Sequence, residues 1–219
     1  MTVVGHWSLV VSLGLTNDHR RTTTDQMRLF VALDLDEPIR DRIRLFMDGV
    51  RNFAPDVRWV RPESLHVTLK FIGEKPSESV NELKSALFAI PATSFSITFQ
   101  GYGFFPTSKS PRVFWIGMQA GPELVKLAAS IDGASAAIGI SKEEHPFTPH
   151  LTLARAGSGA PRRQKGDSPN RNFQRLQEKL AALPTPEFGT MTAHEFFLFE
   201  SELGRGGSRY KKLAGFPLK

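Results

Sequence analysis

The sequence of 219 residues contains no cysteine, and this absence removes several kinds of chemistry at once. Without a thiol the chain has no disulfide, no thiolate nucleophile and no cysteine-based zinc site. A chain that does without disulfides suits a reducing compartment, and we therefore expect a cytoplasmic protein. Any catalysis has to come from other side chains.

Long hydrophobic runs are also missing. No stretch reaches the roughly 20 apolar residues that a membrane-spanning helix needs, so we expect no membrane partner. Val3 to Leu15 is apolar enough to suggest a signal peptide, but it lacks a basic n-region and an Ala-x-Ala cleavage site. We interpret residues 1–26 as an N-terminal extension, expected to be disordered, because Met27 directly precedes the first convincing strand.

Positive charge is in surplus. The chain has 28 Lys and Arg residues against 22 Asp and Glu residues, which gives a formal net charge of +6 and a pI near 9.8. This balance favours a polyanionic partner such as nucleic acid, although many basic proteins merely carry solvated lysines. With 40% hydrophobic residues and 17 phenylalanines, residues 27–219 can bury the core of a single bilobal domain.

A short motif occurs twice, as Leu65-His66-Val67-Thr68-Leu69 and again as Pro149-His150-Leu151-Thr152-Leu153. Successive side chains of a strand point to opposite faces, so in each copy the histidine and the threonine share one face. The hydrophobic residues share the other face and can hold the strand in a core. An imidazole and a hydroxyl are then left on the polar face for chemistry.

A single His-x-Thr strand is more often structural than catalytic. Two copies, separated by about half a domain, instead indicate a duplicated unit whose equivalent strands meet across a pseudo-two-fold cleft. Metal binding is the other alternative. Zinc requires three or four protein ligands, and neither motif contains a carboxylate, so we expect no metal site.

The remaining pattern predicts an α+β fold: two pseudo-symmetric lobes of antiparallel-rich sheet with helices outside, around a central cleft. A polar, basic segment at about residues 156–170 is expected to be a mobile loop or lid. The expected helices span residues 36–50, 77–90 (with Val80, Leu83, Leu87 and Phe88 inward), 122–138 and 173–182. The expected strands, besides the two motifs, span residues 28–34, 57–60, 95–99, 112–118, 192–199 and an edge strand at 209–218, with a loop at 101–106.

The chain resembles the two-histidine phosphoesterase superfamily, and within it the LigT-like RNA 2′,3′-cyclic phosphodiesterases. The resemblance runs from Met27 to Leu218, and the extension before it and the basic loop depart from it. Besides the paired motifs, it is carried by the segments Met27–Asp34, Arg58–Gly73, Pro111–Trp115, Phe147–Arg155 and Tyr210–Leu218.

This resemblance implies an enzyme that hydrolyses a terminal 2′,3′-cyclic phosphate on RNA to a 2′-phosphate, with no cofactor; some relatives also join tRNA halves through a 2′,5′ linkage. It assigns His66 as the proton donor to the leaving oxygen and His150 as the acceptor that activates water. Histidine titrates near neutrality, so two imidazoles can serve as an acid–base pair. The hydroxyls of Thr68 and Thr152 can donate to the phosphate oxygens, and Arg155 looks like the family's phosphate-binding arginine.

Three side chains next to the motifs have two interpretations each. Arg155, five residues after His150, is either a phosphate ligand or a surface arginine in a salt bridge. Strict alternation points it away from the face of His150, so the phosphate role requires a bend in the strand. Phe71, five residues after His66, is either a base or sugar contact or a core residue. Lys70 shares the face of His66 and is either a phosphate ligand or an exposed cation.

Two other functions stay open. One is the hydrolysis of ADP-ribose cyclic phosphate or another small cyclic nucleotide, and the other is a non-catalytic module that binds RNA ends. The basic loop favours RNA, and the paired motifs favour catalysis because a pure binder needs no acid–base pair. We therefore expect a monomer whose partners are RNA 3′ ends or nucleotides that carry a 2′,3′-cyclic phosphate.

Overall fold

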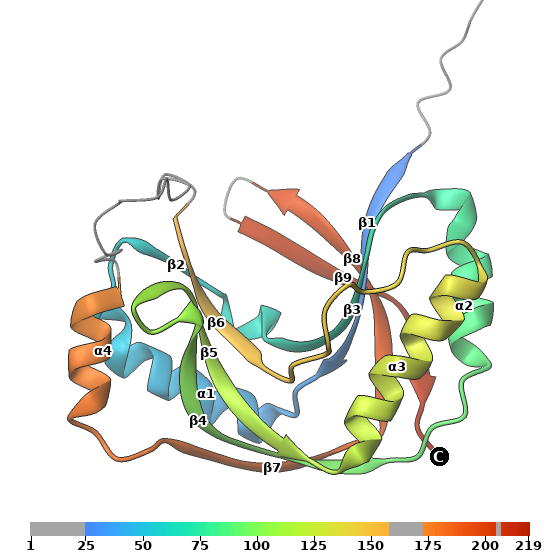
Figure 1. Ribbon diagram of the computed structural model, residues 1–219. Coiled ribbons are helices and arrows are strands. Elements are labelled where there is room, and N and C mark those ends of the chain that lie inside the picture. Colours follow the sequence, from blue (N-terminus) through green and yellow to red (C-terminus); the bar gives the residue numbers. More distant parts are fainter. Residues whose placement is uncertain (1–24, 158–172, 205–206) are drawn as a thin grey trace, which may run out of the picture.

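The computed structural model describes residues 25–157, 173–204 and 207–219. Two sheets with antiparallel strand pairs form its frame (Figure 1). The first sheet has the order β3 (His66–Pro76), β1 (Gln26–Asp34), β8 (Glu195–Gly204), β9 (Gly207–Pro217). The second has the order β2 (Val57–Trp59), β6 (Leu151–Ala156), β5 (Ser110–Ala120), β4 (Phe95–Thr107), β7 (Glu187–Ala193).

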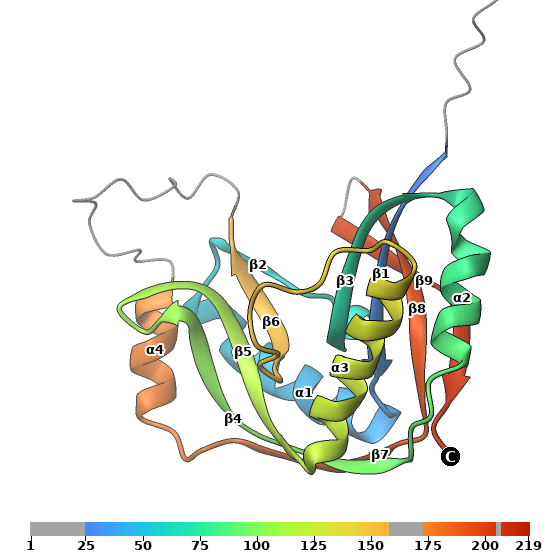
Figure 2. The ribbon, with the colours of Figure 1, turned by 45° about the vertical axis from the view of Figure 1, so that its right-hand side comes forward.

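Helices α1 and α3 connect the two sheets, because each packs against the sheet to which its preceding strand does not belong. Helix α1 (Glu37–Val50) follows β1 of the first sheet, yet Phe46 stacks edge-on against Phe188 of β7 at 5.2 Å. Helix α3 (Pro122–Ala137) follows β5 of the second sheet, yet it packs against β3 of the first. Helices α2 (Val80–Phe88) and α4 (Gln174–Ala181) lie outside the sheets (Figures 1 and 2).

Helix α1 shows how the sequence sets these elements. Asp36 caps its N-terminus by accepting a hydrogen bond from the backbone N–H of Ile39 at 3.1 Å. Ile39, Ile43 and Met47 recur at helical spacing and are almost completely buried. Each such side chain contributes on the order of 1.5–3 kcal/mol through burial.

One hydrophobic core serves both sheets, because a single cluster of buried side chains includes Val31 of β1, Ile116 of β5 and residues from all four helices. A smaller cluster on the other face of the first sheet contains Phe30 and Phe199, with Tyr210 packed against it. A shift of one motif strand relative to the other would disturb the shared core, so the two lobes are not independent in packing.

Four expectations about the elements were wrong. The expected loop at residues 101–106 is part of β4, where a bulge after Phe99 and the positive φ of Gly101 (70°) keep the strand paired with β5. The expected strand at 192–199 is two strands, β7 and β8, which belong to different sheets. Phe88, expected on the inner face of its helix, is 73% exposed, and the first turn of that helix, Ser77–Ser79, is 3-10.

Other expectations agree with the structure. The α+β class and the two antiparallel sheets are as predicted, and β9 forms an edge of its sheet. Residues 1–24 and 158–172, which include most of the N-terminal extension and of the expected basic loop, lie outside the described residues. Within the described ranges no helix is long and apolar enough to cross a membrane.

Candidate active site

The two motif strands, β3 and β6, face each other from the two sheets (Figures 1 and 2). Between them lies a cleft of about 490 Å³. All six residues predicted for the site line this cleft: His66, Thr68, Phe71, His150, Thr152 and Arg155. The structure thus brings together side chains that are separated by up to 89 positions in the sequence.

The two imidazoles are anchored in the same way. Nδ1 of His66 lies 2.7 Å from the carbonyl oxygen of Ser64, and Nδ1 of His150 lies 2.8 Å from that of Thr148. A carbonyl oxygen only accepts hydrogen bonds, so each Nδ1 carries the proton and donates it. Nε2 of each ring is then the nitrogen that can take up or release a proton.

A β-bulge at the same place in both strands explains where the later residues point. The pairing of β3 with β1 skips Leu69, and the pairing of β6 with β5 skips Leu153. Each bulge shifts the alternation by one residue. Phe71 and Arg155 therefore return to the cleft side, and the bend that the phosphate role of Arg155 required is this bulge.

Lys70 does not point into the cleft, and the interpretation that placed it on the face of His66 was wrong. The bulge turns it into the protein, where it is 2% exposed. Its Nζ donates to Oδ1 of Asp132 on α3 at 2.6 Å and to the carbonyl oxygen of Ser141 at 2.9 Å. The hydrogen bond from Lys70 is the main reason that the pKa of Asp132 is lowered.

Aromatic rings surround both histidines. The ring of His66 lies 4.8 Å from that of Phe30 and meets Tyr210 edge-on at 5.0 Å. The ring of His150 meets Phe105 edge-on at 5.0 Å. Burial lowers the pKa of His66 to about 4, and burial also lowers the pKa of His150. In the free protein both imidazoles are thus mainly neutral at pH 7.

A charged network supports the strand end next to His66. Asp34 is the residue of β1 that pairs with His66, and its carboxylate binds Arg40 and Lys212, each at 2.6 Å. Burial raises the pKa of Asp34, but these two hydrogen bonds outweigh that effect and the net pKa is lowered. Arg40 also donates to the carbonyl oxygen of Pro62 at 2.8 Å, in the turn before the motif. No local pattern indicates this contact, because Arg40 lies on α1, 26 positions before His66.

Positive side chains line the rest of the cleft. Besides Arg155, it is lined by Arg28, Arg58 and Arg61, for which the sequence alone predicted no role. Across residues 25–157, 173–204 and 207–219, no group of His, Asp and Glu side chains is arranged so that it could hold a metal ion.

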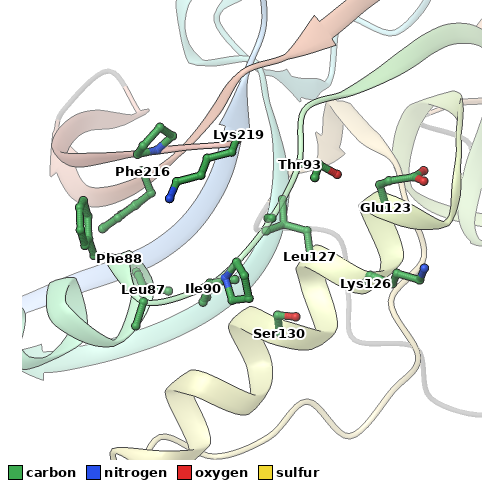
Figure 3. A pocket seen from close by; sticks show the side chains of 14 residues that line it. Leu87, Phe88, Ile90, Thr93, Glu123, Lys126, Leu127, Ser130, Phe216 and Lys219 are labelled. Atoms are coloured by element: carbon green, nitrogen blue, oxygen red, sulfur yellow. The ribbon is translucent and has the colours of Figure 1, made fainter.

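A second hollow, of about 550 Å³, lies between the end of α2, helix α3 and the C-terminal end of β9 (Figure 3). Its wall includes the hydrophobic residues Leu87, Leu127 and Phe216, and the charged Glu123 and Lys126 lie on the side of α3. None of its lining residues is a histidine. Although this hollow is slightly larger, both motif histidines lie in the cleft between β3 and β6.

Comparison with known proteins fits this geometry. The model of the family described as "LigT like Phosphoesterase" matches residues 33–115 and 116–210, so each match contains one His-x-Thr motif. The chain belongs to the LigT-like phosphoesterase family. Both the predicted family and the predicted fold class are therefore confirmed.

Among its relatives, an RNA 2′,3′-cyclic phosphodiesterase of Archaeoglobus fulgidus is 32% identical over 190 residues, which is 87% of this chain and 99% of that protein. The protein of the same name from Escherichia coli is 30% identical over 198 residues, covering 89% of this chain and 98% of that one. The crystal structure of E. coli LigT complexed with 3′-AMP superimposes with a TM-score of 0.70 over 89% of this chain and 99% of that chain, at 30% identity.

Proposed function

We propose that this protein hydrolyses the 2′,3′-cyclic phosphate at the end of an RNA to a 2′-phosphate, by acid–base catalysis with His66 and His150 and without a metal ion. One observation carries the proposal: two imidazoles, each anchored through Nδ1 to a carbonyl oxygen two residues earlier, line one cleft with a threonine beside each. Relatives named RNA 2′,3′-cyclic phosphodiesterase, each about 30% identical, support the substrate.

In the proposed reaction, Nε2 of His150 takes a proton from water, whose oxygen attacks the phosphorus. The bond from phosphorus to the 3′ oxygen breaks, and Nε2–H of His66 gives its proton to that oxygen. Burial lowers the pKa of His66 to about 4, and the backbone hydrogen bond to Ser64 and the carboxylate of Asp34 oppose this lowering. The choice of His66 as the proton donor follows the family resemblance. A bound phosphate anion raises the pKa of a nearby imidazole further.

Negative charge develops on the phosphate oxygens during this reaction. Thr68 and Thr152 stand beside the two histidines and would donate their hydroxyl protons to these oxygens. Arg155, on the cleft side after the bulge, would donate through its guanidinium. Phe71 is 59% exposed and lines the same cleft, so its ring can stack on the terminal base or contact the sugar.

The proposal is tested by incubating the purified protein in EDTA with a dinucleotide that ends in a 2′,3′-cyclic phosphate and identifying the product. We expect a 2′-phosphate end and no loss of rate in EDTA. A 3′-phosphate product would contradict the proposed orientation of the leaving oxygen, and an inactive protein restored by added zinc, magnesium or manganese would contradict the two-histidine mechanism. The cytoplasmic location and the monomeric state stay predictions.

A further inference from the structure

Two arginines face each other across neighbouring strands at one end of the cleft. Arg58 of β2 pairs directly with Arg155 of β6 in the antiparallel register, and both line the cleft that contains His150. Like charges directly opposite each other in such a pair are destabilising. Burial lowers the pKa of Arg155; Tyr210 raises it, and the nearby charge of Arg58 lowers it.

No carboxylate relieves this repulsion in the part of the chain that the structure describes, since neither Arg58 nor Arg155 forms an ion pair there. Other arginines do have such partners: Arg40 pairs with Asp34 at 2.6 Å and Arg44 with Asp41 at 3.2 Å. Two guanidinium groups held together in a cleft without a carboxylate form a site that a bound anion would stabilise.

The position of this pair relative to the histidines indicates which anion it takes. Thr152, beside the reacting phosphate of the proposed function, lies three residues before Arg155 on β6. At about 3.3 Å per residue, Arg155 is about 10 Å further along the strand, and Arg58 lies directly opposite it on the edge strand β2. Arg155 can therefore reach toward the reacting phosphate, whereas Arg58 stands where a second phosphate of the same substrate would lie.

We propose that Arg58, together with the side of the Arg155 guanidinium that faces it, binds the phosphodiester that precedes the terminal nucleotide of the RNA. This inference rests on the proposed function and adds a specificity to it: the enzyme prefers an oligonucleotide to a cyclic mononucleotide. Arg58 takes no part in the chemistry and acts through substrate binding. The anion also removes the cost of placing the two arginines opposite each other.

The test uses three substrates with the same terminal nucleotide and the same cyclic phosphate. The first is a dinucleotide with a normal phosphodiester, the second is the same dinucleotide with an uncharged methylphosphonate linkage, and the third is the cyclic mononucleotide. We expect the wild-type kcat/KM for the phosphodiester to exceed that for the other two by roughly 5- to 30-fold, as expected for one charge-assisted contact.

Arg58→Ala should remove this preference. We expect its kcat/KM to fall roughly 5- to 30-fold for the phosphodiester dinucleotide, mainly through KM, and to change less than about twofold for the other two substrates. Arg44→Ala, which removes the same charge from an exposed part of α1, should keep the wild-type ratio. The slope of log kcat/KM against log salt concentration should become shallower by about 0.7 in Arg58→Ala, as for the loss of one phosphate contact to a single strand.

Each other outcome is informative. Equal losses on all three substrates would show that Arg58 serves the fold or the reacting phosphate, and an unchanged preference would show that it does not contact the second phosphate; both overturn the inference. Hydrolysis of all three by the wild type with equal efficiency would overturn the second subsite alone. A wild-type protein that hydrolyses none of them would overturn the proposed function as well. The melting temperature of Arg58→Ala should be at or above that of the wild type, because a repulsive pair is removed.

Discussion

The strand with the first motif and the strand with the second differ less in their backbone than in the residues after the threonine. Both place the histidine and the threonine on the cleft side, both skip one leucine in a bulge, and both anchor Nδ1 two residues upstream. After the bulge they diverge: β3 continues with Lys70 and Phe71, β6 with Ala154 and Arg155. The shared part holds the groups proposed for the reaction, and the divergent part places an aromatic ring on one strand and a guanidinium on the other.

This difference gives the cleft a direction. A nucleotide with a base at one end and phosphates at the other fits an aromatic residue on one strand and a guanidinium on the opposite strand. Two identical strands would bind a symmetric ligand equally well in both orientations. We infer that Phe71 and Arg155 distinguish the two ends of the substrate, so that one histidine always meets the leaving oxygen.

The shared part should give the largest effects. We expect His66→Ala and His150→Ala each to lower kcat by roughly two to four orders of magnitude, the usual contribution of a positioned acid or base. The fold should persist because hydrophobic neighbours hold both strands. Single-turnover assays and melting curves check this, and a near wild-type rate in either variant would contradict the assignment of that histidine.

The residue directly after the bulge is buried in both strands, but it is the charged Lys70 in β3 and the small hydrophobic Ala154 in β6. Only β3 therefore needs a partner for a buried charge. Asp132→Ala leaves Lys70, whose side chain is 1% exposed, without its charged partner and should destabilise the fold by roughly 3–5 kcal/mol. Lys70→Met leaves the partly exposed Asp132 and should cost less, about 1–3 kcal/mol, after discounting for solvent. Urea denaturation measures both, and the reverse order of the two variants would contradict the geometry.

The two threonines should have similar, smaller effects on the reaction. Thr68→Ala and Thr152→Ala each remove one hydrogen-bond donor to the phosphate, so we expect kcat to fall between about tenfold and a thousandfold. Thr68→Ser and Thr152→Ser keep the hydroxyl and should restore most of the rate. Steady-state kinetics of the four variants decides this, and serine variants as slow as the alanine variants would show that the methyl group matters instead.

The smallest effects should come from the divergent part, and they should fall on binding. Phe71→Ala removes a surface for stacking and should raise KM by roughly 5- to 30-fold if one base stacks on it. Phe71→Tyr keeps the ring and serves as the matched control. Since Phe71 is 59% exposed, its loss should leave the melting temperature almost unchanged, whereas a large fall in stability would favour the core interpretation.

The sequence predicted the elements and the motif faces well because alternation and helical spacing are local properties. It correctly indicated Val80, Leu83 and Leu87 as the buried face of α2, and the common face of His66 and Thr68. It failed at Lys70, because one bulge residue reverses every later side chain in a strand and leaves no compositional sign. The contacts of Arg40 and the pairing of Arg58 with Arg155 depend on strand order, which a single sequence does not specify.

The pH dependence of kcat/KM, measured in EDTA from about pH 4 to 9, tests the central claim most directly, since it reports the pKa values of the free enzyme. Burial lowers the pKa of both His66 and His150. The active state, in which the pair carries one proton, therefore loses that proton at a lower pH than two ordinary histidines would. We predict a bell-shaped profile with its maximum below about pH 6.5, whose two limbs belong to the pair. A flat profile, or a rate that rises steadily through about pH 9, would contradict two-histidine catalysis.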